Sequence, residues 1–187
     1  MKMYVFSLPF TSESQMIDFL CEMIAEHYID MTVNSVRNIT PSYQEQLYKQ
    51  YGTQSKFQIN CRKLLTDVVA YNDRVDLTYI TCIAFNESRF TYNVVALDGA
   101  RGIMQVMPSN LKKFPKKKDW QIAVDYLEQI IERSPSECHV FSEYASGSNF
   151  CSKNKTNKTR QYAKKMMECR QFLNDSVNCR YFDRCGC

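Results

Sequence analysis

Hydrophobic residues recur at intervals of three and four along much of the chain, which is the spacing of one face of an α-helix. Such stretches follow Ser14, Ser55, Asp73 and Asp119, and each of these residues is of a type that favours the start of a helix. A further short helix is expected over residues 42–51, before a glycine. The pattern predicts a mainly α-helical protein.

The helix predicted after Asp73 differs from the others because it is apolar around nearly its whole circumference, from Val75 to Phe85. A helix of this kind lies at the centre of a fold. It reaches Glu87 at its C-terminal end, at the edge of the core. Apolar neighbours and the helix dipole both raise the pKa of a carboxyl group there. A raised pKa suits a carboxyl group that donates a proton near neutral pH.

The sequence after this helix carries a series of short motifs. Glu87-Ser88 is followed by Gly102-Ile103-Met104-Gln105, then by Tyr144-Ala145-Ser146-Gly147, and finally by a segment around Tyr162. In this order and spacing they resemble the lytic transglycosylases of the soluble (SLT) type, which cut the glycan strands of bacterial peptidoglycan. The resemblance covers about residues 77–167. It implies a lysozyme-like fold with a cleft between helical parts.

The resemblance also implies the roles of individual residues. Glu87 would be the catalytic residue, and no metal or cofactor is expected. Ala145 stands where the family usually has Asn, and Lys158 stands where it has Glu. The expected substrate-binding residues are Ser88, Gly102, Met104, Gln105, Tyr144 and Tyr162.

Only one carboxylate is placed by these motifs, although most glycosidases use two. In the family, the Glu protonates the leaving oxygen and then takes a proton from the 6-hydroxyl of the muramic sugar, which closes a 1,6-anhydro ring. Two alternatives stay open. One is a hydrolytic muramidase of the goose type, with Asp98 as the nearest later carboxylate. The other is a glycan-binding structural protein of a phage particle with weak activity.

Composition bounds the domain organisation and the location. The 187 residues carry a net charge of +4, and no apolar run approaches the roughly 18 residues of a membrane span. We expect a helical extension (1–72), a catalytic domain (73–167) and a cysteine-rich tail (168–187). The beginning of the chain lacks the pattern of a secretory signal. The expected place is the cell wall, reached in the periplasm or as part of a virion.

The expected partners follow from this location. Peptidoglycan strands are the main one, and residues 1–72 are a candidate docking segment for other virion or secretion-machine proteins. No nucleic acid is expected. The lysine-rich stretch 112–118 is either a solvated loop or a rim that attracts an anionic polymer.

Nine cysteines are a high number for a chain of this length. Cys82, within the apolar helix, reads most simply as a small buried core residue. Four others crowd the tail, where two disulfide bridges, a zinc site and free thiols are alternatives. The zinc reading lacks the C-x-x-C pair that is typical of structural sites. The tail cysteines are Cys169, Cys179, Cys185 and Cys187.

Overall fold

A computed structural model describes residues 10, 12–35, 54–147 and 158–181 of the chain. It confirms the mainly α-helical class, and these residues contain no strand beyond isolated β-bridges. No helix among them combines the length and the apolar character that crossing a membrane requires. The helices are α1 (Glu13–Ser35), α3 (Gln54–Tyr71), α4 (Leu77–Ser88), α5 (Pro108–Lys113), α6 (Asp119–Arg133), α7 (Glu137–Ser146) and α8 (Lys158–Tyr181).

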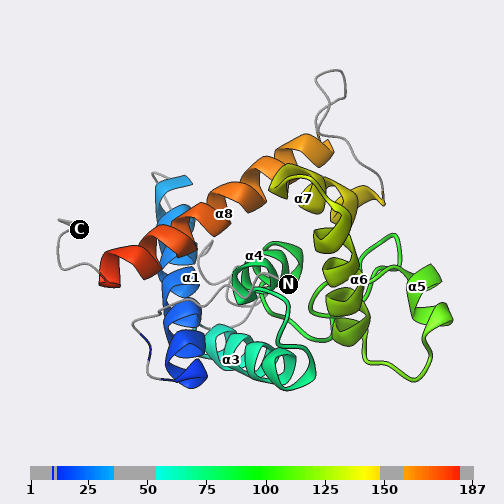
Figure 1. The fold of residues 1–187 in the computed structure, drawn as a ribbon, viewed down its shortest axis with the longest axis horizontal. Helices are drawn as coiled ribbons and strands as arrows, with labels where there is room; N and C mark the ends of the chain where they lie inside the picture. The colour runs from blue at the N-terminus through cyan, green and yellow to red at the C-terminus, as the bar shows by residue number, and fades with distance from the viewer. Residues whose placement is uncertain (1–9, 11, 36–53, 148–157, 182–187) are drawn as a thin grey trace.

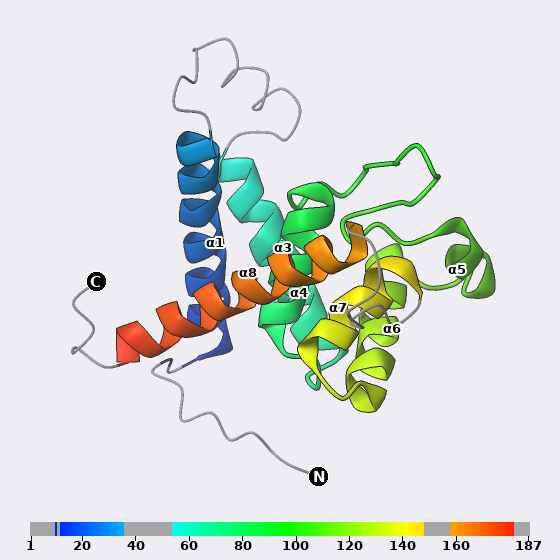
Figure 2. The same cartoon turned by 90° about the horizontal axis from the view of Figure 1, so that it is seen from above.

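Helix α4 lies at the centre of the molecule, with the longer helices arranged around it (Figure 1). Every residue from Leu77 to Phe85 is buried, as the all-round apolar pattern predicts. The helix packs against α1, α3 and α8. In contrast, α5 lies on the side of α6 that faces away from α4, in this view and in the view turned by 90° (Figure 2).

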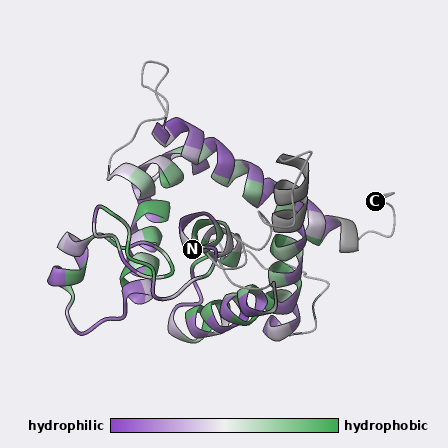
Figure 3. Ribbon diagram, turned by 180° about the vertical axis from the view of Figure 1, so that it is seen from behind, coloured by the Kyte–Doolittle hydropathy of each residue, from purple (hydrophilic) through white to green (hydrophobic). Residues whose placement is uncertain are grey.

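The outer helices are amphipathic, and each turns its apolar side inward. Figure 3 shows α8 as largely hydrophilic, with hydrophobic positions recurring along its length. Those positions belong to the same core as α1, α3 and α4. The predicted face of α6 is buried in this core, namely Trp120, Ala123, Val124, Leu127 and Ile130.

Several helix starts differ from the sequence-based expectation. Helix α4 is capped by Asp76, whose Oδ1 accepts a hydrogen bond of 2.8 Å from the Thr78 N–H, so Asp73 is not the cap. Asp119 lies inside the first turn of α6, after the N-cap Lys118. Such shifts are common because neighbouring polar residues compete for the same cap. The helix expected over 42–51 lies outside the described residues.

Two disulfides join helices across the core. Cys21–Cys61 links α1 to α3, and Cys82–Cys169 links α4 to α8. Cys138 is disulfide-bonded as well. The interpretation of Cys82 as a simple core thiol is therefore wrong. Pairing among the tail cysteines alone is also wrong, because the tail's first cysteine bonds the central helix.

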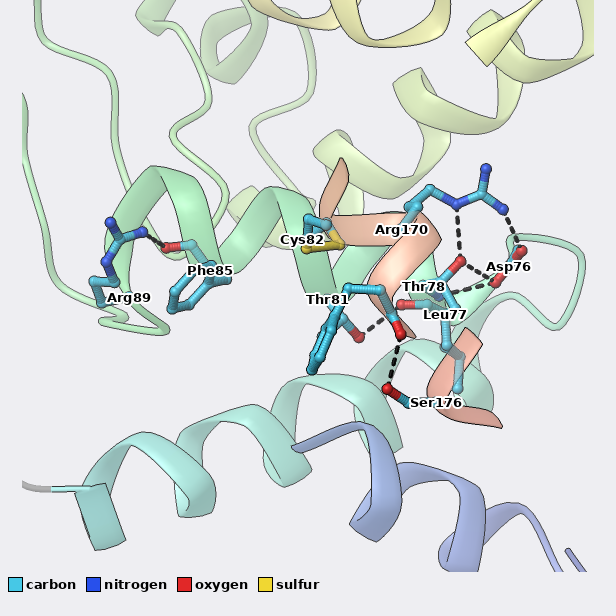
Figure 4. Close-up of a disulfide and its surroundings, with 11 residues drawn as sticks. Asp76, Leu77, Thr78, Thr81, Cys82, Phe85, Arg89, Arg170 and Ser176 are labelled. Carbon is cyan, nitrogen blue, oxygen red and sulfur yellow. Dashed lines mark hydrogen bonds and ion pairs between the residues drawn. A yellow bond between two sulfur atoms is a disulfide. The ribbon is translucent and has the colours of Figure 1, made fainter. Parts of the chain in front are cut away.

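The first part of the tail belongs to the main core rather than to a separate segment. Helix α8 runs without interruption through the expected boundary at 167/168. Arg170 is only 6 % exposed. Its guanidinium bonds Asp76 Oδ2 at 2.7 Å and Thr78 Oγ1 at 2.9 Å (Figure 4). It also pairs with Glu137. The Cys82–Cys169 disulfide therefore ties this part of the tail to the central core. Cys185 and Cys187 lie outside the described residues.

Candidate active site

The C-terminal end of α4 places Glu87 in its last turn. At the end of the helix, the Arg89 N–H bonds Phe85 O at 3.1 Å and the Phe90 N–H bonds Ala84 O at 3.3 Å. Glycine is usual at such a stop, but here Arg89 and Phe90 both adopt left-handed backbone, with φ of 52° and 55°. Left-handed conformations of this kind are costly for residues other than glycine, and they cluster at functional sites.

Two contacts hold this strained turn, one between aromatic rings and one between a cation and a ring. The Phe90 ring is fully buried and meets the Phe57 ring edge-on at 4.8 Å between centroids. The Arg89 guanidinium lies over the Phe85 ring at 4.2 Å and donates a hydrogen bond to the Phe85 carbonyl. The backbone that follows Glu87 is therefore fixed by packing on both sides.

Burial raises the pKa of the Glu87 carboxyl above its ordinary value of 4.5. Smaller effects oppose the rise, namely hydrogen bonding from Tyr162 and Asn86 and the positive charge of Arg89, while the charge of Asp98 adds to it. A carboxyl group whose pKa is raised in this way can stay protonated closer to neutral pH. The site therefore holds a carboxyl group whose raised pKa suits a proton donor, and its catalytic role stays a prediction.

Two tyrosines from different helices face this carboxyl group. Tyr144 comes from α7 and Tyr162 from α8, and burial raises the pKa of both hydroxyls, with the charge of Glu87 as the next cause. The Tyr144 hydroxyl donates a hydrogen bond of 2.9 Å to the Met104 carbonyl. The buried Tyr162 hydroxyl has no hydrogen bond of regular geometry to any described residue. Its interaction with Glu87 is therefore a loose contact.

Ser88 joins the end of α4 to the glycine-containing segment. Its buried hydroxyl donates to the Ile103 carbonyl at 2.7 Å and accepts from the Thr91 N–H at 3.1 Å. These bonds fix the backbone on both sides of the site. A direct contact between Ser88 and substrate stays a prediction.

The turn at Gly102 explains why a glycine is required there. Gly102 has φ of +80°, and a Cβ on it would lie 1.7 Å from Asp119 Oδ2. Gln105 is also left-handed, with φ of 51°, and its side-chain amide donates to Gly102 O at 2.8 Å. The Met104 side chain is only 1 % exposed and belongs to the core. Its carbonyl, rather than its thioether, is the group that meets Tyr144.

The structure brings further residues to the site that the sequence reasoning missed. Lys165 lies near Glu87, and burial lowers its pKa, with the charge of Arg89 as the next cause. Its position three residues after Tyr162 on α8 was an available signal, since residues at that spacing share a helix face. Asp119, which backs Gly102, also has a pKa raised by burial. No group of three His, Cys, Asp or Glu residues within the described ranges is placed to hold a metal ion.

These residues lie within a segment that matches a known family. The sequence pattern described as "Transglycosylase SLT domain" matches residues 64–167, more than half of the chain. The chain belongs to the transglycosylase SLT family. Comparisons with curated proteins and with solved structures gave no match. Membership supports a lysozyme-like activity that cleaves peptidoglycan, a substrate found outside the cytoplasm.

The match extends from α3 to the first half of α8. It therefore includes Glu87 and every expected substrate-binding residue. It carries no information on a phage particle or a secretion machine, so those partners stay predictions.

Proposed function

We propose that the protein is a peptidoglycan lytic transglycosylase in which Glu87 acts first as an acid and then as a base. The observation that carries the proposal is the half-buried Glu87 at the end of α4, with its raised pKa and two tyrosine hydroxyls beside it. The family provides the substrate class. The β-1,4 bond cleaved is the one between N-acetylmuramic acid and N-acetylglucosamine.

The proposed reaction needs only this one carboxyl group. Protonated Glu87 gives its proton to the glycosidic oxygen, and the bond from that oxygen to C1 of the muramic sugar breaks. The C6 hydroxyl oxygen of the same sugar then bonds to C1, and its proton passes to the Glu87 carboxylate. The products are a free 4-hydroxyl and a 1,6-anhydro end. No water is consumed, and Glu87 ends protonated as it began.

The tyrosines and Ser88 have positioning roles in this scheme. Loose contact with the Tyr162 hydroxyl favours the carboxylate that exists between the two proton transfers, because it lowers the pKa of Glu87. Tyr144 holds the Met104 carbonyl, and Ser88 holds the Ile103 carbonyl, so both fix the segment Gly102–Gln105 against the end of α4. That segment is the proposed wall of the cleft.

A location outside the cytoplasm suits this function. Cys21–Cys61, Cys82–Cys169 and the bonded Cys138 are disulfide cysteines within or next to the family match. Disulfides persist in oxidising compartments such as the periplasm or the cell exterior.

One observation favours a hydrolytic alternative. The charge of Asp98 reaches Glu87 and raises its pKa, so a second carboxylate acts on the site. Asp98 lies in an exposed loop, where its Oδ1 accepts from the Ala100 N–H at 3.1 Å. In a goose-type muramidase this carboxylate would direct a water to C1.

Mass spectrometry of the cleaved glycan separates the two reactions. Purified walls are digested by the wild type and by Asp98→Asn, which keeps the shape of the side chain. The transglycosylase proposal expects new muramic ends lighter by one water than reducing ends, and activity in both proteins. Reducing ends, together with loss of cleavage in Asp98→Asn, would establish the hydrolytic alternative instead.

A further inference from the structure

A hollow lies between α5 and α6, away from the end of α4 that carries Glu87. It has a volume of about 280 Å³. Figures 1 and 2 both show α5 on the side of α6 that is remote from α4. Its lining combines apolar, amide and charged side chains, namely Asn110, Phe114, Lys117, Ile122, Asp125, Tyr126, Glu128 and Gln129.

The lining has the chemistry of a saccharide subsite. Phe114 is 47 % exposed, so its ring offers an apolar face to a ligand. The side-chain amides of Asn110 and Gln129 make no hydrogen bond to any other described residue, and both line the hollow. Sugar rings present apolar C–H faces and hydroxyl or acetamido groups, which these two kinds of side chain can contact.

The floor of the hollow is held rigid. Asp125 accepts a hydrogen bond of 2.9 Å from the Tyr71 hydroxyl and pairs with Lys117. The Tyr71 ring in turn meets the Trp120 ring edge-on at 5.5 Å. A floor fixed in this way loses little conformational freedom when a ligand binds.

Three further lysines are neighbours in the sequence of the lining residues Asn110, Phe114 and Lys117. Lys112 and Lys113 form the last turn of α5, and Lys116 follows in the connection to α6. All three side chains are exposed, and none makes an ion pair with a residue that the structure describes. Figure 3 shows this connection as hydrophilic. These three lysines give the end of α5 and the connection after it a positive charge, which favours an anionic ligand beside the hollow.

We propose that the hollow between α5 and α6 is a second, non-catalytic site that holds an anionic glycan. A sugar ring would lie on Phe114, its polar substituents would meet Asn110 and Gln129, and carboxylates along the strand would lie near Lys112, Lys113 and Lys116. Identifying this glycan as a peptidoglycan strand rests on the proposed function. Such a site would keep the protein on the wall between cleavage events.

Wall binding by a protein that cannot cut tests this site. In a Glu87→Gln background, one variant carries Phe114→Ala and another carries Lys112→Ser, Lys113→Ser and Lys116→Ser. We expect each to bind purified walls about tenfold more weakly than Glu87→Gln alone. The lysine effect should shrink as salt is added, because exposed charges are screened. The matched control, Lys56→Ser with Lys63→Ser on α3, should stay within about twofold.

Two outcomes would overturn the site. In the first, both variants bind walls as the control does. In the second, walls stripped of phosphate-containing polymers bind Glu87→Gln no better than the lysine variant, which would make phosphate rather than glycan the ligand. Cleavage by the otherwise unaltered protein is measured separately. Weakened binding without any cleavage would support the site and contradict the proposed function, whereas cleavage with unaltered binding would do the reverse.

Discussion

The two ends of α4 show how one helix can serve stability at one end and chemistry at the other. At the N-terminal end, Asp76 is both the helix cap and the partner of the buried Arg170. At the C-terminal end, Glu87 is half-buried, has a pKa raised by desolvation and makes only a loose contact with Tyr162. Desolvation raises the pKa of Glu87, so this carboxyl group can hold a proton closer to neutral pH.

Helices α4 and α8 together form the contacts at both ends of α4. Arg170 and Tyr162 belong to α8, and the Cys82–Cys169 bridge joins α8 to α4 between these two contacts. Figure 4 shows this bridge beside Arg170, Asp76 and Thr78. The position of Tyr162 over Glu87 therefore depends on the docking of α8. Four variants and one titration test this comparison.

The largest expected effect is at the C-terminal end of α4, where Glu87 lies. Glu87→Gln removes both proton transfers, each of which contributes on the order of 10²–10⁴ in rate, so wall cleavage should fall by several orders of magnitude. Loss of turbidity of purified walls measures it. The variant must also stay folded. Its melting temperature at pH 7 should equal or exceed that of the wild type, because ionised Glu87 carries a cost of burial that Gln lacks.

The next largest effect distinguishes the Cys82–Cys169 disulfide from the Cys21–Cys61 disulfide. Removing Cys82–Cys169 with Cys82→Ala and Cys169→Ala should lower the free energy of unfolding by about 2–4 kcal/mol and also reduce cleavage, because α8 carries Tyr162. The matched control is Cys21→Ala with Cys61→Ala, which frees α1 from α3. It should cost similar stability with a smaller loss of activity. Equal losses of activity in the two pairs would argue against a positioning role for α8.

The N-terminal end of α4 is tested by Arg170→Met, a variant that keeps much of the apolar stem of the side chain. It removes charged hydrogen bonds to Asp76, Thr78 and Glu137 and the stacking on Tyr79 at 3.6 Å, so we expect a loss of about 2–3 kcal/mol in denaturant unfolding. Arg133→Met breaks the more exposed pair with Glu143 and should cost less than about 1 kcal/mol. Similar costs for the two variants would show that burial of Arg170 adds nothing.

The smallest effect concerns the loose contact. Tyr162→Phe removes a hydroxyl that lowers the pKa of Glu87, so that pKa should rise further and cleavage should fall about three- to tenfold. The alkaline limb of the pH profile of kcat/KM should then move to higher pH. Tyr144→Phe loses only the bond to the Met104 carbonyl and should leave the limb in place. If Tyr162→Phe left the alkaline limb in place, the Tyr162 hydroxyl would have no influence on the pKa of Glu87.

The comparison of the two ends also shows what the sequence could and could not predict. The position of Glu87 at the end of a buried helix was predictable, because its two signals, the apolar run and the end of the helix, are local in the sequence. Arg170 and the partner of Cys82 were not, since each contact joins positions about 90 residues apart in the chain. No local pattern selects one arginine or one cysteine of the tail for the central helix. Packing alone decides these pairings.

The site shows the same division. Gly102, Met104 and Gln105 are expected to bind substrate, and they lie within the residues that match the family. Sequence could not say that the Met104 side chain points into the core while its carbonyl meets Tyr144. Backbone contacts of this kind follow from the left-handed turn, in which Gln105 stands where glycine would be easier.

Titration of the Glu87 carboxyl group tests the central claim most directly. Protein labelled with carbon-13 at its glutamate carboxyl groups is followed by NMR over pH, and the Glu87 signal is assigned by its absence from Glu87→Gln. The account predicts a midpoint clearly above 4.5, because burial outweighs the contacts that favour the carboxylate. A midpoint at or below 4.5 would contradict it, since burial would then not raise the pKa of this carboxyl group.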